Sequence, residues 1–116
     1  MNDLKKRVEA YADWDYNIKV AGPSFTQPVL DKLYPLDWEH INILLLREPE
    51  NEYDSNAIKV LANGEGIGYI PRMVAVPLAQ QLDSGVEFDT RLIYITAGEG
   101  KKIKTSKVAL RRKSNG

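Results

Sequence analysis

The segment from residue 41 to residue 72 constrains the fold most, because it combines strand patterns with turn signals. Residues 41–47 and 56–62 are strand-like runs, and a polar eight-residue loop lies between them. Asn63 and Gly64 both tolerate positive φ and therefore predict a tight hairpin after the second run. A polar loop held on a rigid β scaffold is a frequent place for binding residues.

Further strands are predicted on both sides of this segment. Residues 14–21 and 86–97 alternate between apolar and polar side chains, as half-buried strands do, and the turn at 98–100 leads to a last strand at about 102–111. The 41–46 run is instead almost entirely apolar, so we expect a central strand that is buried on both faces. With a short strand at 67–70, the count is six, and short strands at this even spacing are typical of a small barrel or sandwich.

A helix is predicted at the N-terminus. Residues 1–13 carry apolar side chains at the spacing of a one-faced helix, namely Leu4, Val8, Tyr11 and Ala12. The apolar face packs either on the domain itself or on a partner chain. The fold class that follows is mainly β within the α+β class, a six-stranded barrel with this terminal helix and one internal helix.

The internal helix follows Arg72. Pro77 is expected early in it, where a missing N–H costs little. Leu78 and Leu82 should face the core, and Gly85 should end the helix. Residues 23–40 give a weaker pattern, with at most one helical turn between two prolines.

Length and composition predict one domain of a simple kind. The chain has 116 residues and no cysteine, which leaves room for one modest core and excludes disulfides, thiol nucleophiles and cysteine-bound zinc. We expect a helical extension at 1–13, a β-barrel domain at 14–112 and a short tail at 113–116. With no signal-peptide pattern and no membrane-spanning run, we expect an intracellular protein.

The net charge of zero hides an uneven distribution. All sixteen acidic residues precede position 100, whereas the last stretch has seven basic ones: Lys101, Lys102, Lys104, Lys107, Arg111, Arg112 and Lys113. A basic terminus of this kind fits a contact with phosphate or with an acidic partner. It fits equally well an edge strand whose lysines discourage aggregation.

Candidate catalytic and metal sites fail on inspection. Four acidic residues alternate through the polar loop, but an EF-hand loop that starts at Glu50 or Glu52 has neither the required glycine at its sixth position nor the required glutamate at its twelfth. His40 is the only histidine, which excludes a multi-histidine metal site. We therefore predict neither an enzyme nor a metal or cofactor site.

The same central segment resembles the HIRAN domain. The resemblance runs through Arg-Glu-Pro at 47–49, Asn51, Tyr-Asp at 53–54, Asn-Ala-Ile at 56–58, Gly-Tyr-Ile-Pro-Arg at 68–72 and the helix that follows, and it covers about a third of the chain. It implies an OB-like barrel, a fold that often binds nucleic-acid strands. It also implies a standalone bacterial or phage-encoded member in the cytoplasm.

Aromatic rings beside cations give the binding prediction its physical basis, because bases stack on rings while basic groups follow the backbone. Tyr53, Tyr69 and Phe25 supply rings, and Arg72 supplies a cation. Asp54 either closes an Asx turn or accepts a hydrogen bond from a terminal sugar hydroxyl, and both roles stay open.

The resemblance assigns roles to these positions. Tyr53 would stack on a terminal base, Asp54 would receive a 3′-hydroxyl, Tyr69 would lie beside the end nucleotides, and Arg72 would hold a phosphate. Ser24 stands where end-binding members have arginine, followed by Phe25 in place of tyrosine. Lys101, Lys102 and Lys104 are candidates to compensate for that loss.

The function predicted is non-catalytic binding of single-stranded DNA, at free 3′-hydroxyl ends, in DNA repair or stalled-fork processing. The alternative is a protein-interaction module whose N-terminal helix docks a helicase or nuclease. Carboxylate-based hydrolysis is a distant third possibility.

Overall fold

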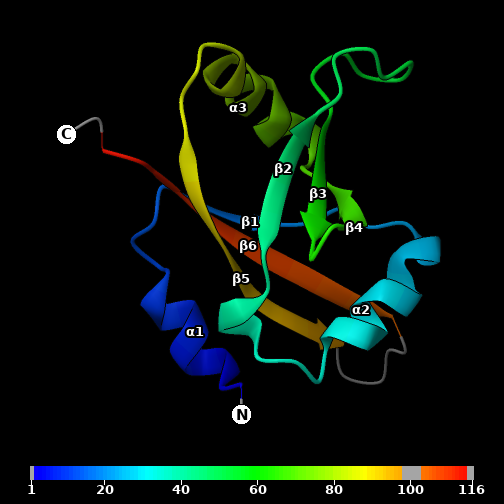
Figure 1. The fold of residues 1–116 in the computed structure, drawn as a ribbon, viewed down its shortest axis with the longest axis vertical. Coiled ribbons are helices and arrows are strands. Elements are labelled where there is room, and N and C mark those ends of the chain that lie inside the picture. The colour runs from blue at the N-terminus through cyan, green and yellow to red at the C-terminus, as the bar shows by residue number, and fades with distance from the viewer. Residues whose placement is uncertain (1, 98–102, 115–116) are drawn as a thin grey trace.

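The strands form two three-stranded antiparallel sheets in the computed structural model, which describes residues 2–97 and 103–114 (Figure 1). In the first sheet the order is β1 (Tyr16–Lys19), β6 (Lys104–Arg112) and β5 (Phe88–Ala97). In the second it is β2 (Ile43–Arg47), β3 (Ile58–Ala62) and β4 (Glu65–Tyr69). The predicted α+β class with six strands is confirmed, and the arrangement agrees with an OB-like fold.

Three helices accompany the sheets: α1 (Leu4–Ala10), α2 (Gln27–Leu33) and α3 (Arg72–Asp83). The helix α2 goes beyond the single turn that the sequence indicated, and it lies between two short 3₁₀ turns, η1 (Ser24–Thr26) and η2 (Trp38–His40). It forms because Leu30 and Leu33 are both 2% exposed in the core, so tertiary packing supports a short helix that local propensity does not favour.

The two sheets meet around one apolar core. Its most deeply buried members come from both sheets and from α3, among them Ile58, Val60, Leu78, Leu92 and Leu110, each 0% exposed. One backbone bridge, between Ala21 just after β1 and Tyr69 on β4, joins the sheets in the part of the chain that the structure describes. Its two N–H···O distances are 2.9 Å from the Ala21 amide and 2.8 Å from the Tyr69 amide.

The prediction for residues 41–46 is wrong. β2 lies at the edge of its sheet, and Leu44 and Leu46 are 52% and 44% exposed, while Ile43 is buried. An unbroken apolar run does not distinguish a central strand from an edge strand with leucines on its outer face, because the number of neighbouring strands is not a local property.

Pro77 also differs from its prediction, since it lies in the interior of α3 rather than in the first turn. The carbonyl that loses its partner there is that of Met73, whose residue is 91% exposed and so can be hydrated. The hairpin and the helix end are as expected, with positive φ at Asn63, Gly64 and Gly85.

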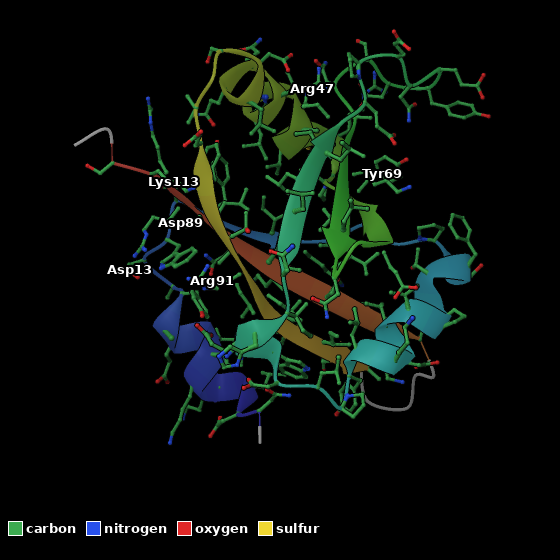
Figure 2. All side chains as sticks on the ribbon, in the orientation of Figure 1. Asp13, Arg47, Tyr69, Asp89, Arg91 and Lys113 are labelled. Atoms are coloured by element: carbon green, nitrogen blue, oxygen red, sulfur yellow. The ribbon has the colours of Figure 1, made fainter. Side chains whose placement is uncertain are left out.

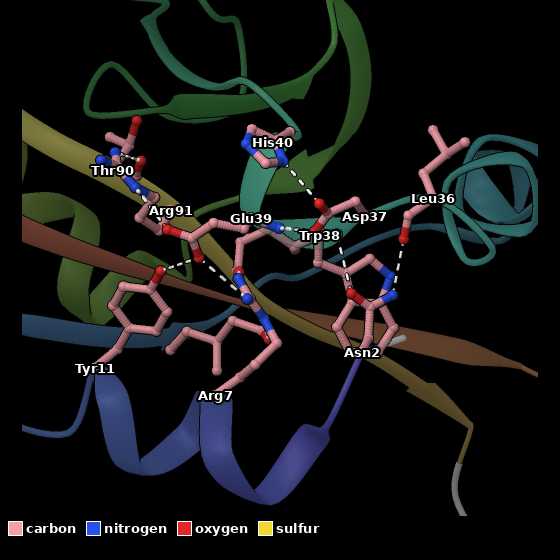
Figure 3. Close-up of polar contacts among 12 residues, drawn as sticks. Asn2, Arg7, Tyr11, Leu36, Asp37, Trp38, Glu39, His40, Thr90 and Arg91 are labelled. Carbon is pink, nitrogen blue, oxygen red and sulfur yellow. Dashed lines mark hydrogen bonds and ion pairs between the residues drawn. The ribbon is translucent and has the colours of Figure 1, made fainter.

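The helix α1 packs against β5 of its own domain (Figure 3). Arg7 donates to the carbonyls of Leu92 and Ile93 at 2.6 and 2.9 Å, and Tyr11 donates to Glu39. Tyr11 packs with Ile93 of β5 and Ala109 of β6 in a small buried cluster. Val8 and Tyr11 of the apolar face therefore make contacts within the domain, whereas Leu4 at the start of the same face is 41% exposed.

Gly68 is required at the bridge between the sheets. Its φ is +144°, and a Cβ there would lie 2.4 Å from the carbonyl oxygen of Ala21. We expect Gly68→Ala to lower the free energy of unfolding by about 1–3 kcal/mol or more, measured by urea denaturation.

Gly66→Ala is the matched control on the same strand. A Cβ at Gly66 meets Cε of Lys59 at 2.8 Å, the movable end of a long side chain, and we expect a change below about 1 kcal/mol. Equal denaturation midpoints for the two variants would contradict the role given to Gly68.

Candidate nucleic-acid interface

A groove of about 440 Å³ lies between the polar loop and the start of α3. Four residues singled out from the sequence line it: Tyr53 and Asp54 from the loop, Tyr69 from the end of β4, and Arg72 from the first position of α3. The fold therefore brings side chains from three separate segments to one place. The remaining lining is Ala21, Asn51, Ala57, Ile70 and Pro71.

Tyr69 is fixed in this groove by its hydroxyl. The Tyr69 hydroxyl donates to Oε1 of Glu48 at 2.8 Å, and Nδ2 of Asn51 donates to the same oxygen at 3.1 Å. These two hydrogen bonds hold the pKa of Glu48 below its usual value, while the bond to Glu48 raises the pKa of Tyr69. The hydrogen bond to Glu48 thus orients the Tyr69 ring.

Asn51 and Asp54 give the loop its shape. Oδ1 of Asn51 accepts from the amides of Tyr53 and Asp54 at 2.9 and 3.2 Å, and Oδ1 of Asp54 accepts from the amide of Asn56 at 2.9 Å. The Asx turn foreseen for Asp54 is present. Its second carboxylate oxygen has no hydrogen-bond partner among the residues described, so the turn leaves one acceptor available.

Arg47 holds the loop closed against α3. Its guanidinium donates to the carbonyls of Ala57 and Ser55 at 2.8 and 3.1 Å and forms a two-point pair with Asp83 at 2.9 and 3.0 Å. Hydrogen bonding to Arg47 lowers the pKa of Asp83. The sequence assigned no role to Arg47, which Figure 2 labels near α3, and its hydrogen bonds indicate that it positions the loop.

A second hollow of about 250 Å³ adjoins the groove at Tyr69, and the two share that one residue. Phe25, the third predicted ring, is 79% exposed and lines this hollow rather than the groove. Lys59 lies in the same hollow, and sequence reasoning missed it. The available signal was its place between Ile58 and Val60, which puts its side chain on the outer face of β3.

The basic C-terminal stretch is partly neutralised inside the domain. Nζ of Lys104 lies 2.6 Å from Asp31, and Arg111 lies 3.4 Å from Asp89. Lys104 therefore is not free to replace the arginine missing at Ser24. Lys101 and Lys102, the other two candidates, lie outside the described residues.

No group of three or more His, Asp or Glu side chains within 2–97 and 103–114 is placed to hold a metal ion. No helix in these ranges has the length and apolarity needed to cross a bilayer.

The profile of the HIRAN domain family matches residues 40–110, more than half of the chain, and the chain belongs to this family. HIRAN domains are DNA-binding domains without catalytic activity of their own. The resemblance seen in the sequence is therefore confirmed.

Individual relatives agree with this assignment. A crystal structure of a protein from Lactobacillus plantarum aligns with a TM-score of 0.59 and 25% identity, over 82% of this chain and 91% of that one. The HIRAN domain of human HLTF shares the fold, with a TM-score of 0.53 and 21% identity over 84% of this chain and 76% of that chain.

A curated relative from Arabidopsis thaliana bears the name putative SWI/SNF-related matrix-associated actin-dependent regulator of chromatin subfamily A member 3-like 1. It is 54% identical over 41 residues, which is 34% of this chain. The chain spans about 5% of the length of that relative, so the likeness concerns one module of a much larger protein.

Removing the charge of Glu48 tests its contact with Tyr69. Because the folded-state pKa of Glu48 is depressed, its carboxylate stabilises the fold above its unfolded pKa and loses that contribution as the pH falls through the folded pKa. We expect Glu48→Gln to cost less than about 1 kcal/mol at pH 7 and the difference from wild type to shrink below about pH 4. Denaturation at a series of pH values measures the difference in stability between Glu48→Gln and wild type, and Glu52→Gln in the same loop is the control. A difference that does not change with pH would contradict the assignment.

Replacing Arg47 tests the closure of the loop. Lysine keeps the charge but cannot form the fork, so Arg47→Lys should cost about 1–2 kcal/mol and speed amide hydrogen exchange in residues 51–57. Arg112→Lys makes the same change at an exposed position of β6 and should leave both quantities unaltered. Unchanged exchange in Arg47→Lys would show that the loop holds its shape without the fork.

Proposed function

We propose that this domain binds single-stranded DNA and captures free 3′-hydroxyl ends in the groove of about 440 Å³, without catalysing a reaction. The observation that carries the proposal is the convergence of Tyr53, Asp54, Tyr69 and Arg72 on that groove. A ring, an acceptor, a second ring and a cation are the groups that a terminal nucleotide requires.

Tyr53 supplies the stacking surface. Its side chain is 86% exposed, which is unfavourable for an aromatic ring unless a ligand covers it, while its backbone amide donates to the side-chain Oδ1 of Asn51. Stacking of one base on such a ring is worth about 1–3 kcal/mol. Tyr69, held by Glu48, supports the other side of the groove.

The start of α3 supplies the positive potential. Arg72 is exposed and takes part in no ion pair among the described residues, and no side chain there caps the first amides of the helix. A helix N-terminus and a free guanidinium both favour an anion such as a backbone phosphate.

Asp54 supplies the selectivity for a free end. One of its oxygens closes the Asx turn, and the other can accept a hydrogen bond from a 3′-hydroxyl. A 3′-phosphate would instead place negative charge next to the carboxylate, which disfavours binding. Free 3′ ends arise in broken and stalled replication intermediates, so the proposed role lies in their repair, alongside a helicase or nuclease.

The test is fluorescence anisotropy with short labelled single strands that end in 3′-hydroxyl or 3′-phosphate, at two salt concentrations. We expect salt-sensitive binding that favours the hydroxyl end. Tyr53→Ala should weaken binding by about tenfold, whereas Tyr53→Phe, which keeps the ring, should change it little.

Asp54→Asn separates end selection from loop structure, because the amide oxygen can still accept from Asn56. It should remove the preference for hydroxyl over phosphate, while Glu52→Gln, the same charge change in the same loop, should preserve it. Binding that ignores the nature of the end in wild type would remove the role of Asp54. No binding of single strands even at low salt would overturn the whole proposal.

A further inference from the structure

The second hollow has its own structure, distinct from the groove at Tyr53. Its walls come from the turn after β1, with Pro23, Phe25 and Thr26, and from the outer face of the β2–β3–β4 sheet. The turn is rigid, because the amide and the hydroxyl of Thr26 both donate to the Pro23 carbonyl, at 3.0 and 2.7 Å. The second hollow thus has a rigid wall, and it continues the groove beyond Tyr69.

Lys59 forms the wall of the second hollow that faces the turn after β1, and its side chain runs along the face of β4. It is the register partner of Tyr69, so the two side chains share the outer face of the sheet. A Cβ on Gly66 would lie 2.8 Å from Cε and 3.5 Å from Nζ of Lys59, which means that the lysine side chain crosses directly over this glycine. Gly66 therefore leaves the space in which the ammonium group sits.

Neither Glu48 nor Glu65 forms an ion pair with Lys59. Glu48 accepts hydrogen bonds from Tyr69 and Asn51, and Glu65 on β4 forms an ion pair with Lys32 at 2.6 Å. Lys59 takes part in no ion pair among the residues that the structure describes. Its attraction for Glu48 is felt at longer range, as one of the influences that lower the pKa of Glu48.

We propose that Lys59 binds the phosphodiester that joins the terminal nucleotide to its neighbour, and that Gly66 sets the position of its ammonium group. A strand whose end lies in the groove must pass Tyr69 to enter the second hollow, and Lys59 stands opposite Tyr69 at that crossing. This inference rests on the proposed function. Lys59, on β3, would also supply a cation of the kind that end-binding family members have as arginine at the position of Ser24.

The first test is Lys59→Gln, which removes the charge and keeps most of the length. Against hexanucleotides with a 3′-hydroxyl we expect about threefold to tenfold weaker binding. The slope of log affinity against log salt should fall in magnitude by about 0.7, the value for one phosphate contact with a single strand. The ratio of affinities for hydroxyl and phosphate ends should stay as in wild type, because Asp54 is untouched.

Three further variants separate this role from a general effect of charge. Lys59→Arg keeps the cation and should retain the wild-type salt slope. Lys6→Gln makes the same charge change on α1 and should leave affinity and slope unaltered. Gly66→Ala should displace the Lys59 side chain with only the small change in stability expected above, and so should reproduce part of the Lys59→Gln effect.

The outcomes distinguish this inference from the proposed function. If wild type binds and selects 3′-hydroxyl ends, but Lys59→Gln matches Lys6→Gln in affinity and slope, then Lys59 is a solvated surface lysine and the inference is wrong. If wild type does not bind single strands at all, the proposed function fails and the inference fails with it. An effect of Lys59→Gln that Gly66→Ala does not share would overturn the role of Gly66 alone.

Discussion

The arrangement of the two sheets depends on one close backbone contact, the bridge between Ala21 and Tyr69. It joins the two sheets, and it can form only because Gly68 lets the segment after β1 approach β4 without a side chain between them. The same contact brings the turn with Phe25 beside Tyr69 and so places the second hollow next to the groove. A single glycine thus links the assembly of the core to the geometry of the candidate site.

Most of the polar residues in the central motif build the loop and leave few for a ligand. Arg47 ties the loop carbonyls to α3, Glu48 orients Tyr69, and Asn51 satisfies two loop amides. Because these groups satisfy one another, the loop is held in shape before any ligand arrives, which lowers the ordering cost of binding. What remains directed outward is an aromatic ring at Tyr53, one oxygen of Asp54 and the guanidinium of Arg72.

Ion pairs within the domain occupy some of its cations and leave others available. Lys104 and Arg111 of the basic C-terminal strand are paired with carboxylates of the same domain, as are Arg7 near the N-terminus and Lys32 on α2. Arg72 and Lys59 belong to no such pair within the described residues, and both line the hollows that meet at Tyr69. In a chain of zero net charge, affinity for a phosphate backbone must come from local cations of this kind, because no long-range attraction supports it.

The sequence by itself determined the six strands, the hairpin at Asn63-Gly64, the family and the four residues of the groove, because turn chemistry, alternation and a motif are local properties that the order of residues records. Tertiary structure decided that β2 is an edge strand, that residues 27–33 form a helix, that α1 covers Ile93, and that Lys59 faces the site. These outcomes depend on which segments become neighbours in space. An apolar residue shows its preference for burial, but the partner that buries it is set only when the whole chain packs.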